Sequence, residues 1–181
     1  MFLMAGSASS PAPRTGAVEC LGLWFDGEVR HSRRTVLSQW IRRMISYVTV
    51  GADDIQSAKR FYSAFLPALG YGLEEGPEGL SYALPEPSGR PALLPEFYVK
   101  PPFDGRPASA GNGAMIAFKA RSQQEVRNLH AAALAAGGRD EGQPGFRDAY
   151  GANFYVGYLR DPHGNKIALY SDNPDEPGRD G

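Results

Sequence analysis

Hydrophobic and polar residues along the chain first show the pattern of a strand followed by a helix. The run "MISYVTVG" (44–51) is rich in β-branched residues and predicts a strand. The segment 53–70 then carries apolar residues at the three- and four-residue spacing of a helix. Asp53 or Asp54 can cap this helix, and Gly70 can end it.

Proline and glycine divide the next part of the pattern. Pro67 lies inside the predicted helix and should distort its last turn, because proline removes a backbone donor and crowds the preceding turn. Three strand patterns separated by Gly and Pro follow. They cover 71–76, 80–86 and 95–102, and together with the first two elements they make a β-α-β-β-β unit.

The same order of elements recurs after the turn-prone stretch 103–113. A strand is predicted over 114–120 and a helix over 122–138, in which Ser122 and Glu125 have the spacing of a capping box. Three further strands are predicted, within 139–148 and over 153–160 and 165–171. The chain therefore contains two modules of the same kind.

The segment before the first strand differs from the rest in composition. It contains the low-complexity stretch "GSASSPAPRTG", and no periodic pattern ties it to a core. We expect a poorly ordered extension here, and the alternative is a basic docking helix around Trp40. The predicted organisation is an extension over 1–43, a domain over 44–173 with module 1 at 44–103 and module 2 at 111–173, and a C-terminal tail over 174–181.

Charge and cysteine content limit the partners and the compartment. The 19 Lys and Arg residues against 20 Asp and Glu leave a formal charge of -1, so no nucleic-acid or anionic-membrane partner is expected. We expect a small uncharged molecule or a protein instead. The single cysteine, Cys20, excludes an intramolecular disulfide. Without a signal h-region or an apolar run of roughly 18 residues, the sequence indicates a soluble, cytoplasmic protein.

Four stretches, taken in order, resemble the vicinal oxygen chelate superfamily of glyoxalase I, bleomycin-resistance proteins and extradiol dioxygenases. They are "ISYVTVGADDIQSAKRFYSAFL", "PPFDGRPASAGNGAMIAF", "AAALAAGG" and "RDPHGNKIAL". The resemblance implies an α+β fold, in which two β-α-β-β-β modules form a curled mixed sheet around a cavity. It places the helices on the outer face and makes a homodimer the expected assembly.

Alternation along the strands predicts which side chains line that cavity. Successive residues of a strand point to opposite faces, and the aliphatic face must lie under the helix. In the strand that contains Glu96, Pro95 can bulge the chain and shift the register by one residue. The residues left for the cavity face are Tyr47, Thr49, Glu96, Tyr98, Met115, Ala117, Ala168 and Tyr170.

The positions that hold the metal in metal-dependent relatives carry unsuitable side chains here. The resemblance places these positions on the first and last strands of each module, at Tyr47, Glu96, Met115 and Ala168. Tyrosine is protonated near neutral pH, a thioether is soft and alanine has no donor atom. A catalytic zinc normally takes three protein ligands. We therefore predict neither a metal nor another cofactor.

The three histidines are not expected to form a metal site in place of the missing ligands. His31 lies in the extension, His130 lies on the second predicted helix and is expected to pack at its edge, and His163 is expected to face water at a turn. No convergent carboxylates accompany them in the sequence.

The predicted function is binding of a small apolar or aromatic molecule without a catalytic metal, as bleomycin-resistance proteins sequester a ligand without transforming it. Glu96 is the candidate catalytic residue, because a desolvated carboxylate can act as a base or accept a ligand hydroxyl. One alternative is a metal-dependent glyoxalase-type lyase or isomerase, or a dioxygenase. The other alternative is a structural or interaction module.

Overall fold

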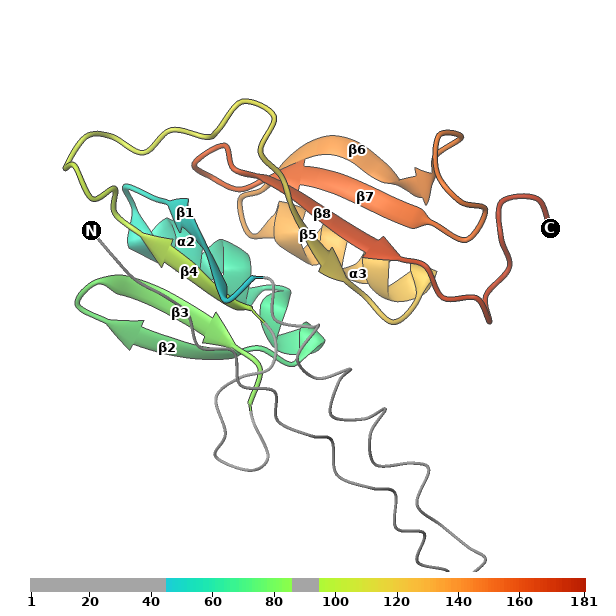
Figure 1. Ribbon diagram of the computed structural model, residues 1–181, viewed down its shortest axis with the longest axis horizontal. Helices are drawn as coiled ribbons and strands as arrows, with labels where there is room; N and C mark the ends of the chain where they lie inside the picture. Colours follow the sequence, from blue (N-terminus) through green and yellow to red (C-terminus); the bar gives the residue numbers. More distant parts are fainter. Residues whose placement is uncertain (1–44, 86–94) are drawn as a thin grey trace, which may run out of the picture.

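Two four-stranded mixed sheets, each carrying one α-helix, form the protein (Figure 1). The computed structural model describes residues 45–85 and 95–181, so the predicted N-terminal extension lies outside the described residues. Module 1 consists of β1 (Tyr47–Gly51), α2 (Ile55–Ser63), the 3-10 helix η1 (Leu66–Leu69), β2 (Gly72–Gly76), β3 (Gly79–Ala83) and β4 (Glu96–Lys100). Module 2 consists of β5 (Ile116–Lys119), α3 (Gln123–Ala135), β6 (Arg139–Phe146), β7 (Tyr155–Arg160) and β8 (Lys166–Ser171).

The two sheets have the same topology. Sheet A has the order β1-β4-β3-β2, and sheet B has the order β5-β8-β7-β6. In each sheet the first and last strands of the module pair in parallel, and the remaining pairs are antiparallel. The predicted α+β class with its repeated β-α-β-β-β order is therefore confirmed.

Helix α2 is short because of the proline that follows it. The Asp54 side chain caps its start by accepting a hydrogen bond from the Ser57 N–H at 2.9 Å. The α-helix ends at Ser63, and the chain continues as a 3-10 turn that contains Pro67. The proline ring would collide with the carbonyl four residues earlier, and its nitrogen has no hydrogen to donate. Gly70 closes the turn with φ 93°, a conformation that favours glycine.

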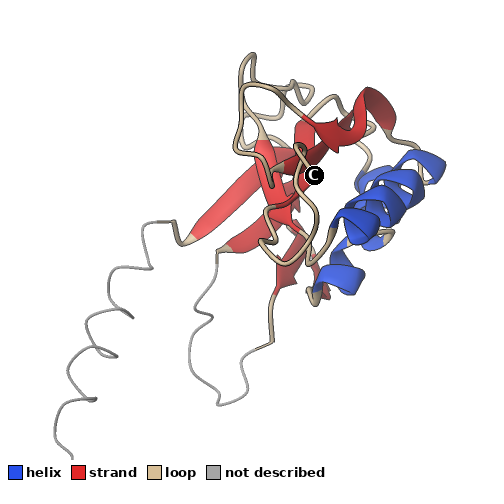
Figure 2. Ribbon diagram, turned by 90° about the vertical axis from the view of Figure 1, so that its right-hand side faces the viewer, coloured by secondary structure: helices blue, strands red, loops and turns tan. Residues whose placement is uncertain are grey.

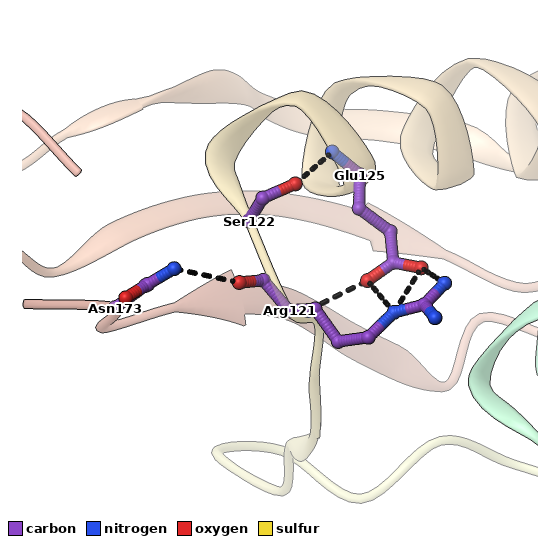
Figure 3. Close-up of polar contacts among 4 residues, drawn as sticks. All are labelled: Arg121, Ser122, Glu125 and Asn173. Carbon is purple, nitrogen blue, oxygen red and sulfur yellow. Dashed lines mark hydrogen bonds and ion pairs between the residues drawn. The ribbon is translucent and has the colours of Figure 1, made fainter. Parts of the chain in front are cut away.

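Helix α3 begins with only half of the predicted capping box. The Ser122 hydroxyl accepts a hydrogen bond from the Glu125 N–H at 3.0 Å, as expected. The Glu125 carboxylate, however, accepts from the backbone N–H of Arg121 at 2.6 Å and pairs with its guanidinium (Figure 3). Asn173 donates to the Arg121 carbonyl at 3.1 Å, which ties the end of the last strand to the start of this helix.

Both helices lie on the same side of the strands, and the modules share one core there (Figure 2). The Phe118 ring of β5 reaches into module 1, with ring centroids 5.7 Å from Phe65 and 5.4 Å from Phe97. At Gly138, beyond α3, an added Cβ would lie 2.7 Å from the ring of Phe61. The same Cβ would lie 2.8 Å from the Ala133 carbonyl oxygen, so both the ring of module 1 and the end of α3 favour glycine at this position.

The turn between β7 and β8 fastens module 2 to module 1. Asp161, which is 3% exposed, accepts a hydrogen bond from the Tyr62 hydroxyl at 2.7 Å. The Asn165 amide donates to the last carbonyl of β1 at 3.0 Å. His163 Nε2 lies 3.1 Å from the Asp54 carbonyl oxygen. His163, which the sequence predicts to face water, is partly buried, because docking of the modules brings the turn against the start of α2.

Candidate functional site

The face of the two sheets turned away from the helices, called the open face, carries the predicted site residues. In sheet A, Tyr47 pairs with Glu96 and Thr49 pairs with Tyr98, so these four side chains share one face. The opposite face is buried under α2 and includes Val50, Phe97 and Val99. The register of β4, which the sequence left open by one residue, is thus the one that places Glu96 on the open face.

In sheet B the corresponding residues share a face but differ in exposure. Ala117 pairs with Ala168, and Met115 precedes β5 and is 47% exposed. Ala168 is only 2% exposed, and it pairs on its other side with the much larger Tyr158. Ala168 therefore offers a ligand almost no surface. Tyr170 stacks on the ring of Phe154, with centroids 5.1 Å apart, and is half-buried.

Two tyrosines and a carboxylate gather on the module 1 half of the open face. The Tyr98 hydroxyl donates a hydrogen bond to the Glu96 carboxylate, and this bond raises the pKa of Tyr98 above its ordinary value. The Tyr47 and Tyr98 rings meet edge to face, with centroids 5.7 Å apart and planes at 77°. The Lys100 ammonium lies 4.9 Å from the centre of the Tyr98 ring and 2.9 Å from a carboxylate oxygen of Glu78. This half therefore combines aromatic surface with negative charge.

The module 2 half is positively charged. The Tyr158 ring is approached by two cations, the Arg147 guanidinium at 5.4 Å and the Lys166 ammonium at 5.2 Å from its centre. Arg160 pairs with Glu141 at 2.5 Å, and its hydrogen bond holds the pKa of Glu141 below its ordinary value. The two halves of the open face therefore differ in the sign of their charge.

The side chains at the metal positions do not form a metal site. Tyr47 and Glu96 are neighbours on adjacent strands, while Met115 and Ala168 belong to module 2. Only Glu96 among these four carries a carboxylate, the kind of oxygen ligand that divalent ions prefer. Within residues 45–85 and 95–181, no group of three or more His, Cys, Asp and Glu side chains could hold a metal ion. The donor set does not fit the metal that the family resemblance implies.

Three pockets adjoin the predicted residues. Thr49 lines a pocket of about 910 Å³ beside the linker that follows β4. Tyr98 lines one of about 370 Å³ together with Glu74, Ser81 and Lys100. Met115 lies in a third, of about 520 Å³, with Arg160 and Lys166.

Charged residues of the open face were missed by the sequence reasoning. Lys100 lies two residues after Tyr98, and Lys166 lies two residues before Ala168, so both share the face of the predicted residues. The same alternation could have found them.

Comparisons with known proteins agree with this architecture. A model of the Glyoxalase/Bleomycin resistance protein/Dioxygenase superfamily matches residues 44–169. A solved glyoxalase/bleomycin resistance protein from Albidiferax ferrireducens T118 is 38% identical, with a TM-score of 0.59 over 71% of this chain and 98% of its own. A glyoxalase-related enzyme from Fulvimarina pelagi is 20% identical, with a TM-score of 0.53 over 71% of this chain and 88% of its own. That second likeness concerns the fold alone.

Two further features, a curated relative and, within the described residues, a membrane-spanning helix, were not found. No curated protein matches the chain. In the part of the chain that the structure describes, neither helix has the length and apolar character needed to cross a membrane.

Proposed function

Because this chain belongs to the Glyoxalase/Bleomycin resistance protein/Dioxygenase superfamily, we propose that it binds a small apolar or aromatic molecule on its open face without a catalytic metal. The observation that carries this proposal is the donor set at the metal positions, which contains one carboxylate, Glu96. Tyr47 and Tyr98 supply aromatic surface beside it, and a binding site for a small molecule needs such surface together with a few placed polar groups.

Glu96 is the polar group that would orient the ligand. In the described residues its carboxylate accepts a hydrogen bond from Tyr98 and has no basic side chain within ion-pair distance. A carboxylate has room for several hydrogen bonds, so further acceptor sites remain for a ligand hydroxyl or amine. The same group is the candidate general base if the ligand is transformed.

A fragment screen by NMR tests the binding proposal. Aromatic fragments should shift the amide signals of β1 and β4, and Glu96→Gln should weaken the binding of those fragments that carry a donor. Failure of every fragment to shift these signals would contradict the proposal.

Elemental analysis tests the metal-free part of the proposal. The purified protein, incubated with Zn, Mn, Ni and Fe(II) and then desalted, should retain well below one metal ion per chain. A metal held at about one per chain, and lost in Glu96→Gln, would favour a metal-dependent lyase, isomerase or dioxygenase instead.

We further propose that the protein acts as a homodimer in the cytoplasm. Met115 and Tyr150 are 47% and 49% exposed, and a second copy would enclose this apolar surface. The single cysteine suits a reducing compartment. Light scattering after size exclusion should give twice the chain mass of 19.6 kDa, and a monomer mass at all concentrations would reject the dimer.

A further inference from the structure

The module 1 half of the open face has the form of an aromatic corner. We use this name for the Tyr47 and Tyr98 rings together with the Glu96 carboxylate. The planes of the two rings meet at 77°, and the carboxylate belongs to the residue paired with Tyr47 on the neighbouring strand. Tyr47 is 63% exposed, so its ring is accessible to a ligand.

Aromatic rings of this kind attract organic cations. The face of a tyrosine ring is negative, and an ammonium group within about 6 Å of its centre is held electrostatically. The protein already uses this interaction at the corner, because the Lys100 ammonium lies 4.9 Å from the centre of the Tyr98 ring. In the described part of the chain, the Tyr47 ring has no such cation.

The charge around the corner has the sign that a cation requires. Glu74 lies in the same cross-strand row as Ser81 and Tyr98, so its side chain shares the open face. Glu74 and Glu96 are ion-paired with no basic side chain of the described residues, whereas Lys100 is paired with Glu78. The two cations that flank Tyr158 belong to module 2.

We propose that the aromatic corner binds an organic ammonium group, a protonated amine or a quaternary ammonium, that is attached to an apolar or aromatic body. The ammonium lies against the Tyr47 ring and beside the Glu96 carboxylate, and the apolar body extends over the open face. This inference rests on the proposed function and adds a positive charge to the apolar or aromatic ligand proposed there. The formal charge of the whole chain, -1, gave no sign of this preference, because it sums the charges of all segments and does not record where they lie.

Three probes of matched size test the charge preference. Benzylammonium, benzyl alcohol and benzoate carry the same ring and differ in charge near neutral pH. Each is titrated into the full chain, and the shifts of the amide signals of β1 and β4 are followed by NMR. Benzylammonium should bind about fivefold more tightly than benzyl alcohol, and benzoate should bind most weakly.

Matched variants locate the effect. Glu96→Gln should remove the preference for the ammonium probe, whereas Glu75→Gln should keep it. Glu75 lies in the same sheet on the helix side, where it pairs with Lys59, so the two variants change the charge of the chain equally. Tyr47→Leu should weaken benzylammonium binding about two- to fivefold, and Tyr47→Phe should retain it, because the ring rather than the hydroxyl holds the cation.

The outcomes separate this inference from the proposed function. Tighter binding of benzylammonium that Glu96→Gln abolishes and Glu75→Gln preserves supports the inference. Equal binding of benzylammonium and benzyl alcohol at the same amides overturns it and leaves small-molecule binding intact. A lack of shifts with benzylammonium also overturns it, and the fragment screen then decides separately whether the open face binds ligands at all.

Discussion

Modules 1 and 2 have the same strand order and the same pairing of first and last strands, yet their open faces differ in charge and in exposure. Module 1 presents Tyr47, 63% exposed, beside Glu96, whereas module 2 presents Ala168, 2% exposed, near the cations Arg147 and Lys166. Strand pairing depends on the backbone and on the buried face, so the open face is free to differ. Four matched metal ligands would require equal contributions from both modules, whereas here the exposed tyrosine ring and the carboxylate lie on the module 1 half alone.

The helix sides of the modules differ as well. Under α2 the core is a cluster of aromatic rings that includes Phe61, Tyr62, Phe65, Tyr82 and Phe97. Under α3 the core is mainly aliphatic and includes Val126, Leu129, Leu159, Ile167 and Leu169. Phe118 is an exception, because it belongs to module 2 and packs into the aromatic cluster of module 1. The cores are therefore distinct in composition and are joined through this ring.

Phe118→Ala should lower the free energy of unfolding more than any other substitution considered, because it removes the ring that joins the two cores. Phe118 is 6% exposed, and deleting a buried aromatic side chain costs about 3–5 kcal/mol. Urea unfolding followed by circular dichroism would measure this loss of the free energy of unfolding. Phe103→Ala is the matched control, since Phe103 is fully exposed in the linker and its loss should change stability by less than about 0.5 kcal/mol. A similar, small effect of both variants would show that Phe118 does not connect the modules energetically.

Tyr62→Phe should have the next largest effect, because it deletes the buried hydrogen bond between the modules. The Tyr62 hydroxyl donates to Asp161 at 2.7 Å, and a hydrogen bond to a charged group contributes about 1.5–3 kcal/mol. Tyr71→Phe is the control, because burial alone raises the pKa of Tyr71 and its hydroxyl has no hydrogen-bond partner among the described residues. Equal free energies of unfolding for Tyr62→Phe and the unmodified chain would contradict the structural role of this bond.

Alkaline pH should lower the free energy of unfolding of the wild-type protein more than that of Tyr62→Phe. Burial, and then the charge of Asp161, raise the pKa of Tyr62 well above its ordinary value. The unfolded chain ionises this tyrosine at about pH 10, so the stabilisation is complete below that pH and is lost as pH rises towards the folded pKa. The difference in unfolding free energy between the two proteins should shrink by up to about 1.4 kcal/mol per pH unit above pH 10. Parallel pH profiles from urea titrations would refute this assignment.

The faces of the strands could be predicted from the sequence, but the docking of the modules could not. Alternation with a period of two assigned Glu96 to the open face and Phe97 to the core, because one face of each sheet is buried. The contacts of His163 and Phe118 depend on how one module lies against the other, and no periodic pattern records that arrangement. The burial of Ala168 likewise depends on its larger cross-strand neighbour, Tyr158, rather than on its own side chain.

Removal of the helix caps should lower the free energy of unfolding least, and by different amounts in the two modules. Asp54 and Ser122 each accept a hydrogen bond from the backbone N–H three residues later, and replacing such a cap by alanine costs about 0.5–2 kcal/mol. At the start of α3 the Glu125 carboxylate also accepts from the Arg121 N–H, so Ser122→Ala leaves one local bond in place. Asp54 additionally places a negative charge at the positive end of the shorter helix.

Asp54→Ala should therefore lower the free energy of unfolding more than Ser122→Ala, by about 0.5 kcal/mol. Asp54→Asn and Ser122→Thr keep a capping oxygen and serve as controls in the same urea titrations. If Ser122→Ala proved the more costly of the two, the second hydrogen bond at α3 would not compensate for the lost cap. Stability would then depend more on the cap of α3 than on the cap of α2. The start of α2 would be held mainly by the turn between β7 and β8, because His163 contacts the Asp54 backbone carbonyl, which remains in Asp54→Ala.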